Sequence, residues 1–410
     1  MGNESKPVLV LSGHRNQQTL FASLAERYRL CFVDTGAAQL AAETHVVDAF
    51  PLLQYADGRL QEQVANEAAR LSSRVVDRLD WVQSRLEEWI GGDYPSDPEA
   101  HLEEWWAGFI HQLLRERLVL ISALDRLSKE HTVAGLVVHE DVTSPARALV
   151  FYAREMNWPT VHVPHAPCHL LDDAGPDIHR QTRTSHLAAT GPRNLDFYRH
   201  NGYAGHAQAT GIPQYDWIYR QPLPSREEAR SVLALESSPV LCYGTTWYQT
   251  TSLRSGMQAE ITASLEAAVN AALQLKAILL ISMHPSDPPQ NESHYAGVLK
   301  QAGIPGLVSR FHFHYLLRAS DVYLKNGPSN GCLIAAALGT PVVMLPTEGF
   351  DFHHRLPFRS TAEGLVDDIR QAMESRDEPG WGELVALYNS AHGTGDGSEK
   401  TAAYIREVCQ

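Results

Sequence analysis

The chain alternates between short apolar runs and amphipathic segments, and this alternation limits its fold more than any other feature. Residues 6–13 (KPVLVLSG) form one such run, and residues 29–36 (RLCFVDTG) and 133–141 (VAGLVVHED) form two more. Each run is rich in Val and Leu and ends in glycine or polar residues. Runs of this kind are typical of strands that are buried on both faces of a parallel sheet, with helices between them. We therefore expect an α/β fold.

A second series of the same kind follows residue 212. Its apolar runs lie at 238–244, 277–282, 321–325 and 340–345. Two such series predict two Rossmann-like, doubly wound domains that face a central cleft. We expect an N-terminal domain at 1–212, a C-terminal domain at 213–385, and a terminal helix at 386–410 that packs back on the first domain. Residues from about 60 to 130 have helical periodicity instead, which predicts a helical insertion in the first domain.

Composition excludes several classes of protein. The net charge of −14 argues against a nucleic-acid-binding protein, because such proteins neutralise phosphates with Lys and Arg. The five cysteines form no Cys-x-x-Cys pair, which favours reduced thiols in a cytoplasmic protein. No apolar run reaches the roughly 20 residues of a membrane span, and the polar N-terminus does not predict a signal peptide. We expect a cytoplasmic protein; peripheral contact with the inner face of the membrane and the oligomeric state stay open.

The 20 histidines do not predict a metal site. His312 and His314 lie close in sequence, as do His353 and His354, but neither pair has the spacing of a known zinc motif. We therefore expect neither a metal ion nor another cofactor.

Polar residues at the carboxyl ends of the predicted strands are the candidates for a site, because ligands bind there in open parallel sheets. In the second series, His284 and Pro285 follow the run at 277–282. A histidine can donate to a phosphate oxygen, and a proline stiffens the loop that presents it. An ordinary loop histidine gives the same pattern, so the interpretation depends on a second anion-binding feature in this half.

That second feature is the segment KNGPSNG, which leads into an apolar helix. Asn326 follows the run at 321–325, and Ser329, Asn330 and Gly331 fall at the start of the helix. Backbone N–H groups and the helix dipole attract a phosphate at such a position. Ser and Asn are also the favoured N-caps, so plain capping is the alternative. Together with the preceding histidine, the segment favours phosphate binding.

A third polar loop, GTTWYQTT, follows the run at 238–244. Gly244 would allow a ligand to approach the backbone closely, and Thr245 and Thr246 could contact a phosphate. The loop is neither a GxGxxG motif nor a P-loop, so by itself it is a weak signal.

In the first half, the residues HED end the run at 133–141. Glu140 or Asp141 could act as a general base or as a nucleophile, and the alternative for Asp141 is capping of the following helix. His165, at the end of the next run, is a candidate acid or acceptor-orienting group, and an ordinary structural loop histidine is the alternative. His14 and Arg15 follow the first run, and Arg15 is the candidate cation there.

The motifs VVHEDVTSPARA, PTVHVPHAP, ISMHPSD and DVYLKNGPSNG…LGTPVVML occur in an order that resembles GT-B proteins. These include non-hydrolysing nucleotide-sugar 2-epimerases, glycerophosphotransferases of wall teichoic acid synthesis, and bacterial sialyl- and Kdo-transferases. The resemblance covers most of residues 131–350 and consists of short motifs. It implies a GT-B fold with the acceptor on the first domain and the donor nucleotide on the second.

Departures from the pattern separate these relatives. The 2-epimerases carry a Gly-Asp-Thr signature near HEDVTSPARA, and their next strand ends in His-x-Glu-Ala-Gly, whereas this one ends in VPHAP. Their acid-bearing helix, which grips the ribose of UDP, is replaced by the acid-free GCLIAAALG. CMP-sugar transferases resemble the rest better. By this resemblance Asp141 is the catalytic carboxylate, and His284 and Ser329 hold the CMP phosphate. The position of His14 and Arg15 after the first run, rather than the resemblance, makes them candidates to meet the sugar or the acceptor.

The resemblance implies a glycosyltransferase that moves a sugar from a nucleotide-sugar donor to a glycan or glycolipid acceptor. The expected sugar is Kdo or another 2-keto acid sugar on CMP, and the expected product is a bacterial surface polysaccharide such as lipopolysaccharide or capsule. One alternative is a nucleotide-sugar 2-epimerase. A second alternative is a catalytically silent GT-B scaffold that binds a glycan.

Overall fold

A computed structural model describes most of the chain. The described residues are 6–12, 17–43, 48–76, 99–139, 144–164, 182–235, 237–245, 255–285, 287–310, 312–326, 329–345, 358–360 and 363–410. The chain forms two compact units, of which one comprises Met1–Val163, Gln181–Leu187 and Ala402–Gln410 and the other Pro164–Arg180 and Ala188–Thr401. The domain boundaries that the sequence suggests at 212 and 385 stay a prediction.

Within the described residues, the N-terminal sheet has seven strands in the order β3-β2-β1-β4-β5-β6-β7. They are β1 (Val8–Ser12), β2 (Arg29–Phe32), β3 (Ala49–Pro51), β4 (Val133–Val138), β5 (Thr160–His162), β6 (His186–Ala189) and β7 (His206–Ala209). All pairings from β3 to β6 are parallel. The first three apolar runs of the sequence form β1, β2 and β4, and their side chains are buried, as expected for strands covered on both faces.

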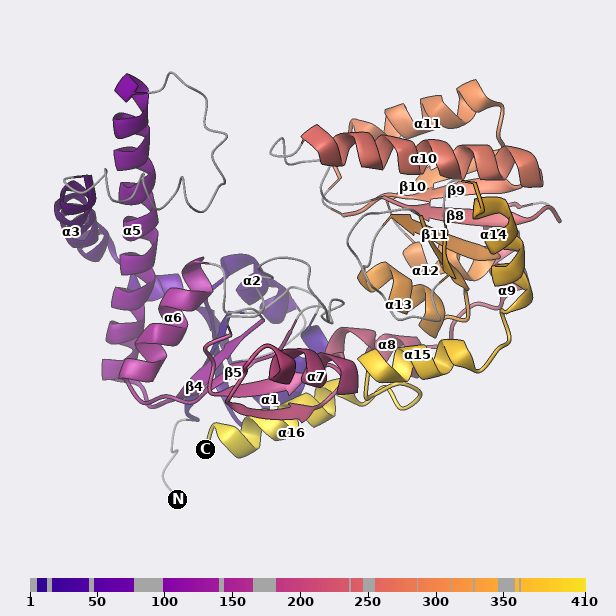
Figure 1. Cartoon of the computed structure of the whole chain (residues 1–410). Helices are drawn as coiled ribbons and strands as arrows, with labels where there is room; N and C mark the ends of the chain where they lie inside the picture. The colour runs from indigo at the N-terminus through magenta and orange to yellow at the C-terminus, as the bar shows by residue number, and fades with distance from the viewer. Residues whose placement is uncertain are drawn as a thin grey trace. The chain divides into compact units, whose positions relative to one another are not determined.

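Helices cover both faces of this sheet. The helices between β1 and β5 are α1 (Gln18–Ala25), α2 (Thr35–Glu43), η1 (Leu52–Tyr55), α3 (Gly58–Val76), α5 (Glu99–Glu130) and α6 (Ser144–Glu155) in the described part of the chain. Side chains of α3, α5 and α6 share one core with those of β1 and β4. The helical insertion expected between residues 60 and 130 is therefore confirmed as α3 and α5, which pack against each other (Figure 1).

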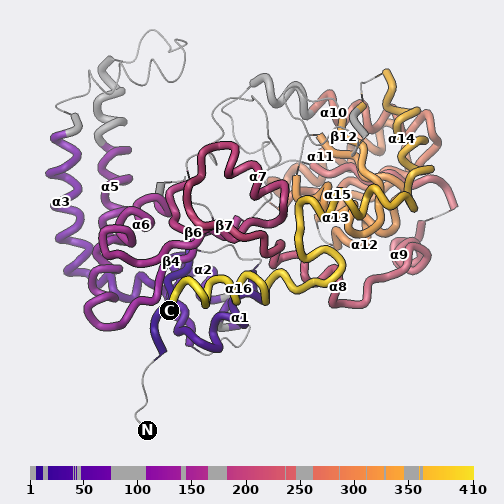
Figure 2. The backbone as a smooth tube through the Cα atoms, turned by 60° about the horizontal axis from the view of Figure 1, so that its bottom comes forward, coloured from indigo at the N-terminus to yellow at the C-terminus, as the bar shows by residue number. Residues whose placement is uncertain are grey.

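The C-terminal helix α16 (Gly397–Val408) contributes to the core of the first unit. It lies beside α1 (Figure 2), and Arg406 donates to the carbonyl oxygen of Ser23 at 3.3 Å. The Tyr28 hydroxyl donates to the carbonyl oxygen of Cys409. Ile405 and Cys409 are fully buried.

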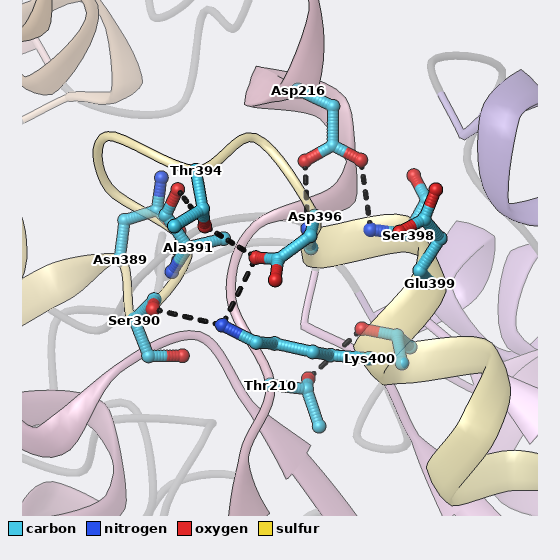
Figure 3. Close-up of polar contacts among 12 residues, drawn as sticks. Thr210, Asp216, Asn389, Ser390, Ala391, Thr394, Asp396, Ser398, Glu399 and Lys400 are labelled. Carbon is cyan, nitrogen blue, oxygen red and sulfur yellow. Dashed lines mark hydrogen bonds and ion pairs between the residues drawn. The ribbon is translucent and has the colours of Figure 1, made fainter. Parts of the chain in front are cut away.

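A polar cluster in the second unit holds the beginning of α16 (Figure 3). The buried carboxylate of Asp216 accepts from the N–H groups of Gly397 at 2.9 Å and Ser398 at 2.8 Å. Thr401 donates to the hydroxyl of Thr210 at 2.9 Å. Burial raises the pKa of Asp216, although the N–H bonds oppose this rise. Asp216 thus caps a helix that begins 181 residues further along the chain.

As far as the chain is described, the second sheet has six strands in the order β10-β9-β8-β11-β12-β13, all parallel. They are β8 (Val240–Gly244), β9 (Ile278–Ser282), β10 (Gly306–Ser309), β11 (Val322–Asn326), β12 (Val342–Leu345) and β13 (Phe358–Arg359). The expected runs at 238–244, 277–282, 321–325 and 340–345 form β8, β9, β11 and β12.

Two helical layers cover the second sheet (Figure 1). One face packs on α10 (Ser255–Leu275), α11 (Asn291–Ala302) and α14 (Leu365–Glu374), and the other on α12 (Phe313–Ala319), α13 (Asn330–Ala337) and α15 (Gly380–Tyr388). The remaining helices of the described chain are α7 (Pro192–His200), η3 (Pro213–Tyr215), α8 (Asp216–Arg220) and α9 (Arg226–Val232). The expected α/β class with two doubly wound sheets is confirmed.

Three general properties of the described residues follow. Cys31, Cys242, Cys332 and Cys409 are reduced, buried thiols, and Cys168 lies outside the described residues. None of the described helices is both long and apolar enough to cross a membrane. The described part of the chain contains no group of three or more His, Cys, Asp or Glu residues that could hold a metal ion.

Candidate functional site

The strand order of the second sheet reverses between β8 and β11. From β8 the chain continues outward through β9 and β10, and from β11 it continues outward through β12 in the other direction. Connections diverge at such a switch point and leave a crevice beyond the carboxyl ends of the two central strands. In register, Gly244 at the end of β8 lies opposite Lys325 on β11 and Ser282 on β9. The residues that the sequence predicts to bind the donor nucleotide are concentrated at these strand ends.

Thr245 connects the loops that follow β8 and β9. Its side chain is buried, with 3% exposure. The hydroxyl donates to the carboxylate of Asp287 at 2.8 Å and accepts from the backbone N–H of His284, also at 2.8 Å. Asp287 accepts further bonds from Asn291 at 2.6 Å and from Tyr295 at 3.1 Å. The hydroxyl of Thr245 is therefore engaged in fixing the His284 loop. Thr246 lies outside the described residues.

Lys325 is a buried cation at the end of β11, with 4% exposure. Its Nζ donates to the carbonyl oxygen of Gly244 at 3.1 Å and to that of Thr245. Burial is the main cause that lowers the pKa of Lys325 to about 8. The sequence analysis did not predict a role for this residue, although a lysine at the end of an apolar run was a sign of a cation at the strand end.

His284 is half-buried, and Pro285 beside it is exposed. Burial lowers the pKa of His284, and the charge of Lys325 lowers it further. The imidazole is therefore neutral at pH 7, with one ring N–H to donate. Arg310, which follows β10, donates from Nη1 to the carbonyl oxygens of His284 at 3.2 Å and Pro285 at 3.1 Å. Arg310 is a second cation at this edge that sequence reasoning missed.

Helix α13 begins at the same edge. Ser329 is its N-cap in extended conformation, but the serine side chain makes no capping hydrogen bond. Its hydroxyl lies 3.8 Å from the sulfur of Cys332. Ser329, Asn330 and Gly331 are all partly exposed. Plain side-chain capping, the alternative reading of this segment, is therefore not what the structure shows.

The side chain of Tyr323 leaves no space for a Cβ atom at two of the glycines. A Cβ atom at Gly244 would lie 2.0 Å from the Tyr323 hydroxyl, and one at Gly331 would lie 2.7 Å from it. Tyr323 is buried, and its hydroxyl fills the space beside both glycines. Gly244 is thus required by a buried neighbour of the chain itself, which is a different reason from the ligand approach that the sequence suggested.

Asn326 lies on the opposite face of β11 from Lys325, as neighbouring residues of a strand do. Its side-chain amide donates to the hydroxyl of Ser264 on α10 at 3.3 Å, and the residue is buried.

An aromatic group lies at the start of α12. The ring of His314 contacts Trp217 at 5.6 Å and Tyr315 at 4.7 Å between centroids. Phe313 of the same turn packs against Tyr323 at 5.8 Å. Burial lowers the pKa of His314. Flat rings of this kind can stack on a planar ligand group.

The corresponding switch point of the N-terminal sheet lies between β1 and β4. The ring Nδ1 of His139 donates to the carbonyl oxygen of Ser12 at 2.7 Å, and the backbone N–H of His139 donates to the same atom at 3.0 Å. The buried His162 donates from Nε2 to the carbonyl oxygen of His139 at 3.1 Å, and its Nδ1 lies 3.1 Å from the Thr182 hydroxyl. The strand end that precedes the predicted carboxylates is therefore held firmly.

Besides Thr246, five predicted residues lie outside the described residues. They are Glu140, Asp141, His165, His14 and Arg15.

No family model matches the sequence, and no curated protein matches it. Solved structures do resemble the chain along nearly its whole length. The UDP-GlcNAc 2-epimerase of Methanocaldococcus jannaschii, in complex with UDP-GlcNAc and UDP, has 10% identity and a TM-score of 0.58, and the match covers 98% of this chain and 100% of that one. HepE of Anabaena, in complex with UDP-glucose, has 12% identity, a TM-score of 0.53 and 98% coverage of both chains. CalG4, the calicheamicin glycosyltransferase, has 13% identity, a TM-score of 0.53 and 98% coverage of both.

The fold is GT-B. This agrees with the fold that the sequence motifs imply. In this GT-B chain, two loops, one helix start and two cations meet at the switch point of the second sheet. Identities of 10% to 13% establish the fold alone, so its chemistry has to be argued from that site.

Proposed function

We propose that this GT-B protein is an enzyme of nucleotide-sugar chemistry that holds the phosphates of its donor at the β8–β9–β11 edge. The observation that carries the proposal is the placement of Lys325, His284 and the start of α13 at one switch point. A buried ammonium, a neutral imidazole donor and a helix N-terminus together form an environment for phosphate oxygens.

The contacts suggest which residues bind the phosphates and which position them. His284 donates a hydrogen bond as a neutral imidazole, and Ser329 and the N–H groups of α13 complete the site. Thr245 and Arg310 act as positioning residues, because they hold the backbone on both sides of His284. The partly exposed rings of Trp217, His314 and Tyr315 are the candidates to contact the base.

The comparisons support a nucleotide-sugar substrate. The proteins that resemble the chain at full length include an epimerase and HepE, both in complex with UDP-containing ligands, and a glycosyltransferase. These ligands favour testing UDP first. The acid-free helix α13 is the feature that favours CMP, and a CMP donor with a 2-keto acid sugar such as Kdo is the finer form of the proposal.

Transfer to a glycan or glycolipid is the reaction that we propose, with Asp141 as base or nucleophile. The second candidate is 2-epimerisation, which the similarity to solved 2-epimerases favours. Transfer is favoured by the segment PTVHVPHAP, because it lacks the carboxylate that the 2-epimerases carry at the end of the corresponding strand. Incubation of the protein with UDP-GlcNAc separates the two, because an epimerase produces a new hexosamine epimer without any acceptor.

A binding measurement tests the phosphate site. We expect UDP or CMP to bind the wild type, and His284→Ala to weaken binding about tenfold through loss of one hydrogen bond to a charged group. Exposed His294 on α11 provides the matched control, and His294→Ala should bind as the wild type does. Equal affinity of the wild type and His284→Ala for every nucleotide would remove His284 from the site. A folded wild type that binds none of CMP, CDP, UDP and GDP would support the silent scaffold instead.

The catalytic assignment needs a separate test. Asp141→Asn should retain nucleotide affinity and lose nearly all transfer, because the amide can neither accept a proton nor attack. Transfer at the wild-type rate by this variant contradicts the role of Asp141.

A further inference from the structure

The ammonium of Lys325 joins the ends of β8 and β11. It donates to the carbonyl oxygens of Gly244 and Thr245, which stand where the β8 loop begins. Thr245 in turn holds the backbone N–H of His284, so the lysine is connected to the predicted phosphate loop through one residue. Charge-assisted hydrogen bonds are stronger than those of neutral donors. The charge state of Lys325 therefore affects how firmly both loops are held.

Several titratable groups surround this ammonium. Asp287 in the loop after β9 favours the charged lysine, and so does Cys332 of α13 when ionised. Burial raises the pKa of Tyr243 on β8, that of Tyr323 on β11 and that of Cys332, so all three stay neutral through moderately alkaline pH.

The ring of His284 does not change charge between pH 7 and 9 either. Burial lowers the pKa of His284, so this ring loses its proton below pH 7. The pKa of Lys325 itself is lowered to about 8, first by burial. Among these groups, Lys325 is the one whose charge changes near pH 8.

We propose that nucleotide binding at this edge is controlled by pH through Lys325, and this rests on the proposed function. The protonated side chain holds the Gly244–Thr245 loop and supplies a buried positive charge beside His284. The neutral amine supplies no charge and makes weaker bonds. In a poorly hydrated interior, loss of one unit charge changes the affinity for an anion more than it does at the surface. Binding of a nucleotide phosphate therefore requires uptake of a proton at alkaline pH.

Calorimetric titration with UDP and with CMP tests this on the full chain, at about pH 7 and about pH 9. The dissociation constant of the wild type should rise about tenfold, as the protonated fraction falls across a pKa of about 8. Lys325→Arg should bind with little change over this range, because guanidinium keeps its charge. Ionisation of the ligand cancels when the two proteins are compared at each pH. Exposed Lys300 provides the control, and Lys300→Met should follow the wild type.

A second measurement needs no variant of Lys325. Titrations of the wild type with CMP at about pH 8.5, in two buffers of different ionisation enthalpy, report the protons taken up on binding. We expect an uptake of about half a proton or more, falling towards zero at about pH 7.

Two results overturn the inference and leave the proposed function intact. One is a wild type whose affinity declines in parallel with that of Lys325→Arg or does not decline at all. The other is binding at about pH 8.5 without proton uptake. Failure of the folded wild type to bind UDP and CMP at about pH 7 overturns the proposed function, and this inference with it.

Discussion

At the residue scale, the site depends on a few buried polar side chains with several partners each. Thr245 is the centre of the group, because its hydroxyl contacts Asp287 and the N–H of His284, and its carbonyl contacts Lys325. A buried carboxylate and a buried ammonium lie on either side of it. Such groups are costly to bury unless their hydrogen bonds are complete. The loop that carries His284 is therefore held in place by contacts within the chain itself.

Removal of the Thr245 hydroxyl tests this arrangement. Thr245→Val preserves the shape of the side chain but leaves Asp287 and the His284 N–H each without one partner. We expect a loss of about 1–3 kcal/mol in the free energy of unfolding, measured by urea denaturation. Thr245→Ser retains the hydroxyl and should lose less than half as much. Equal losses in the two variants would show that the methyl group matters rather than the hydrogen bonds.

At the element scale, close packing between strands and helix α13 decides which residues can stand at the edge. Tyr323 reaches from β11 to the end of β8 and to the first turn of α13, and glycine stands at both contact points. A side chain on β11 thereby sets the distance between a loop and a helix. The glycines at this edge are explained by packing, whereas a sequence motif would assign them to ligand contact.

Gly331→Ala tests this packing. The new Cβ would lie 2.7 Å from the Tyr323 hydroxyl, so we expect a loss of about 1–3 kcal/mol in the free energy of unfolding. The double variant Gly331→Ala/Tyr323→Phe should recover part of that loss, because it removes the atom that clashes. Gly297→Ala is the matched control: Gly297 lies within α11 with no atom near its Cβ position, and alanine there should stabilise slightly. Additive effects of the two substitutions would contradict the clash.

At the scale of the whole molecule, the chain returns to its first unit after completing the second. Residues from Ala402 onward belong to the first unit, where Ile405 and Cys409 are fully buried. A Cβ atom at Gly135 on β4 would lie 2.7 Å from the Cys409 sulfur, which shows how tightly this segment packs on the sheet. The stability of the first unit thus depends on the last residues of the chain.

Deletion of Ala402–Gln410 should destabilise the first unit selectively. Loss of the fully buried side chains of Ala402, Ile405 and Cys409, and of the acceptor for the Tyr28 hydroxyl, should cost about 3 kcal/mol or more. Hydrogen exchange should show faster exchange in β1, β2 and β4 and little change in β8, β9 and β11. Uniformly faster exchange in both sheets would contradict a separate dependence of the first unit on this segment.

Strand positions, fold class and the neighbourhood of His284 and Ser329 were predictable from the sequence alone. Strands buried on both faces leave a continuous apolar run, and the carboxyl end of each run marks where the next polar residue must emerge. These signals are local, so each can be read within about ten residues. The same reasoning extends to Asp141, whose role stays a prediction because it lies outside the described residues.

Only the tertiary structure decided what those residues touch. Nothing near Lys325 in the sequence shows that its ammonium reaches the carbonyls of Gly244 and Thr245, about 80 residues away. The sequence also does not show that Tyr323 lies against Gly244 and Gly331, or that Asp216 caps α16. The apolar pattern of a strand records burial, which is a property of one segment. Hydrogen bonds and steric contacts belong to pairs of segments, and the pairing exists only after the sheet has assembled.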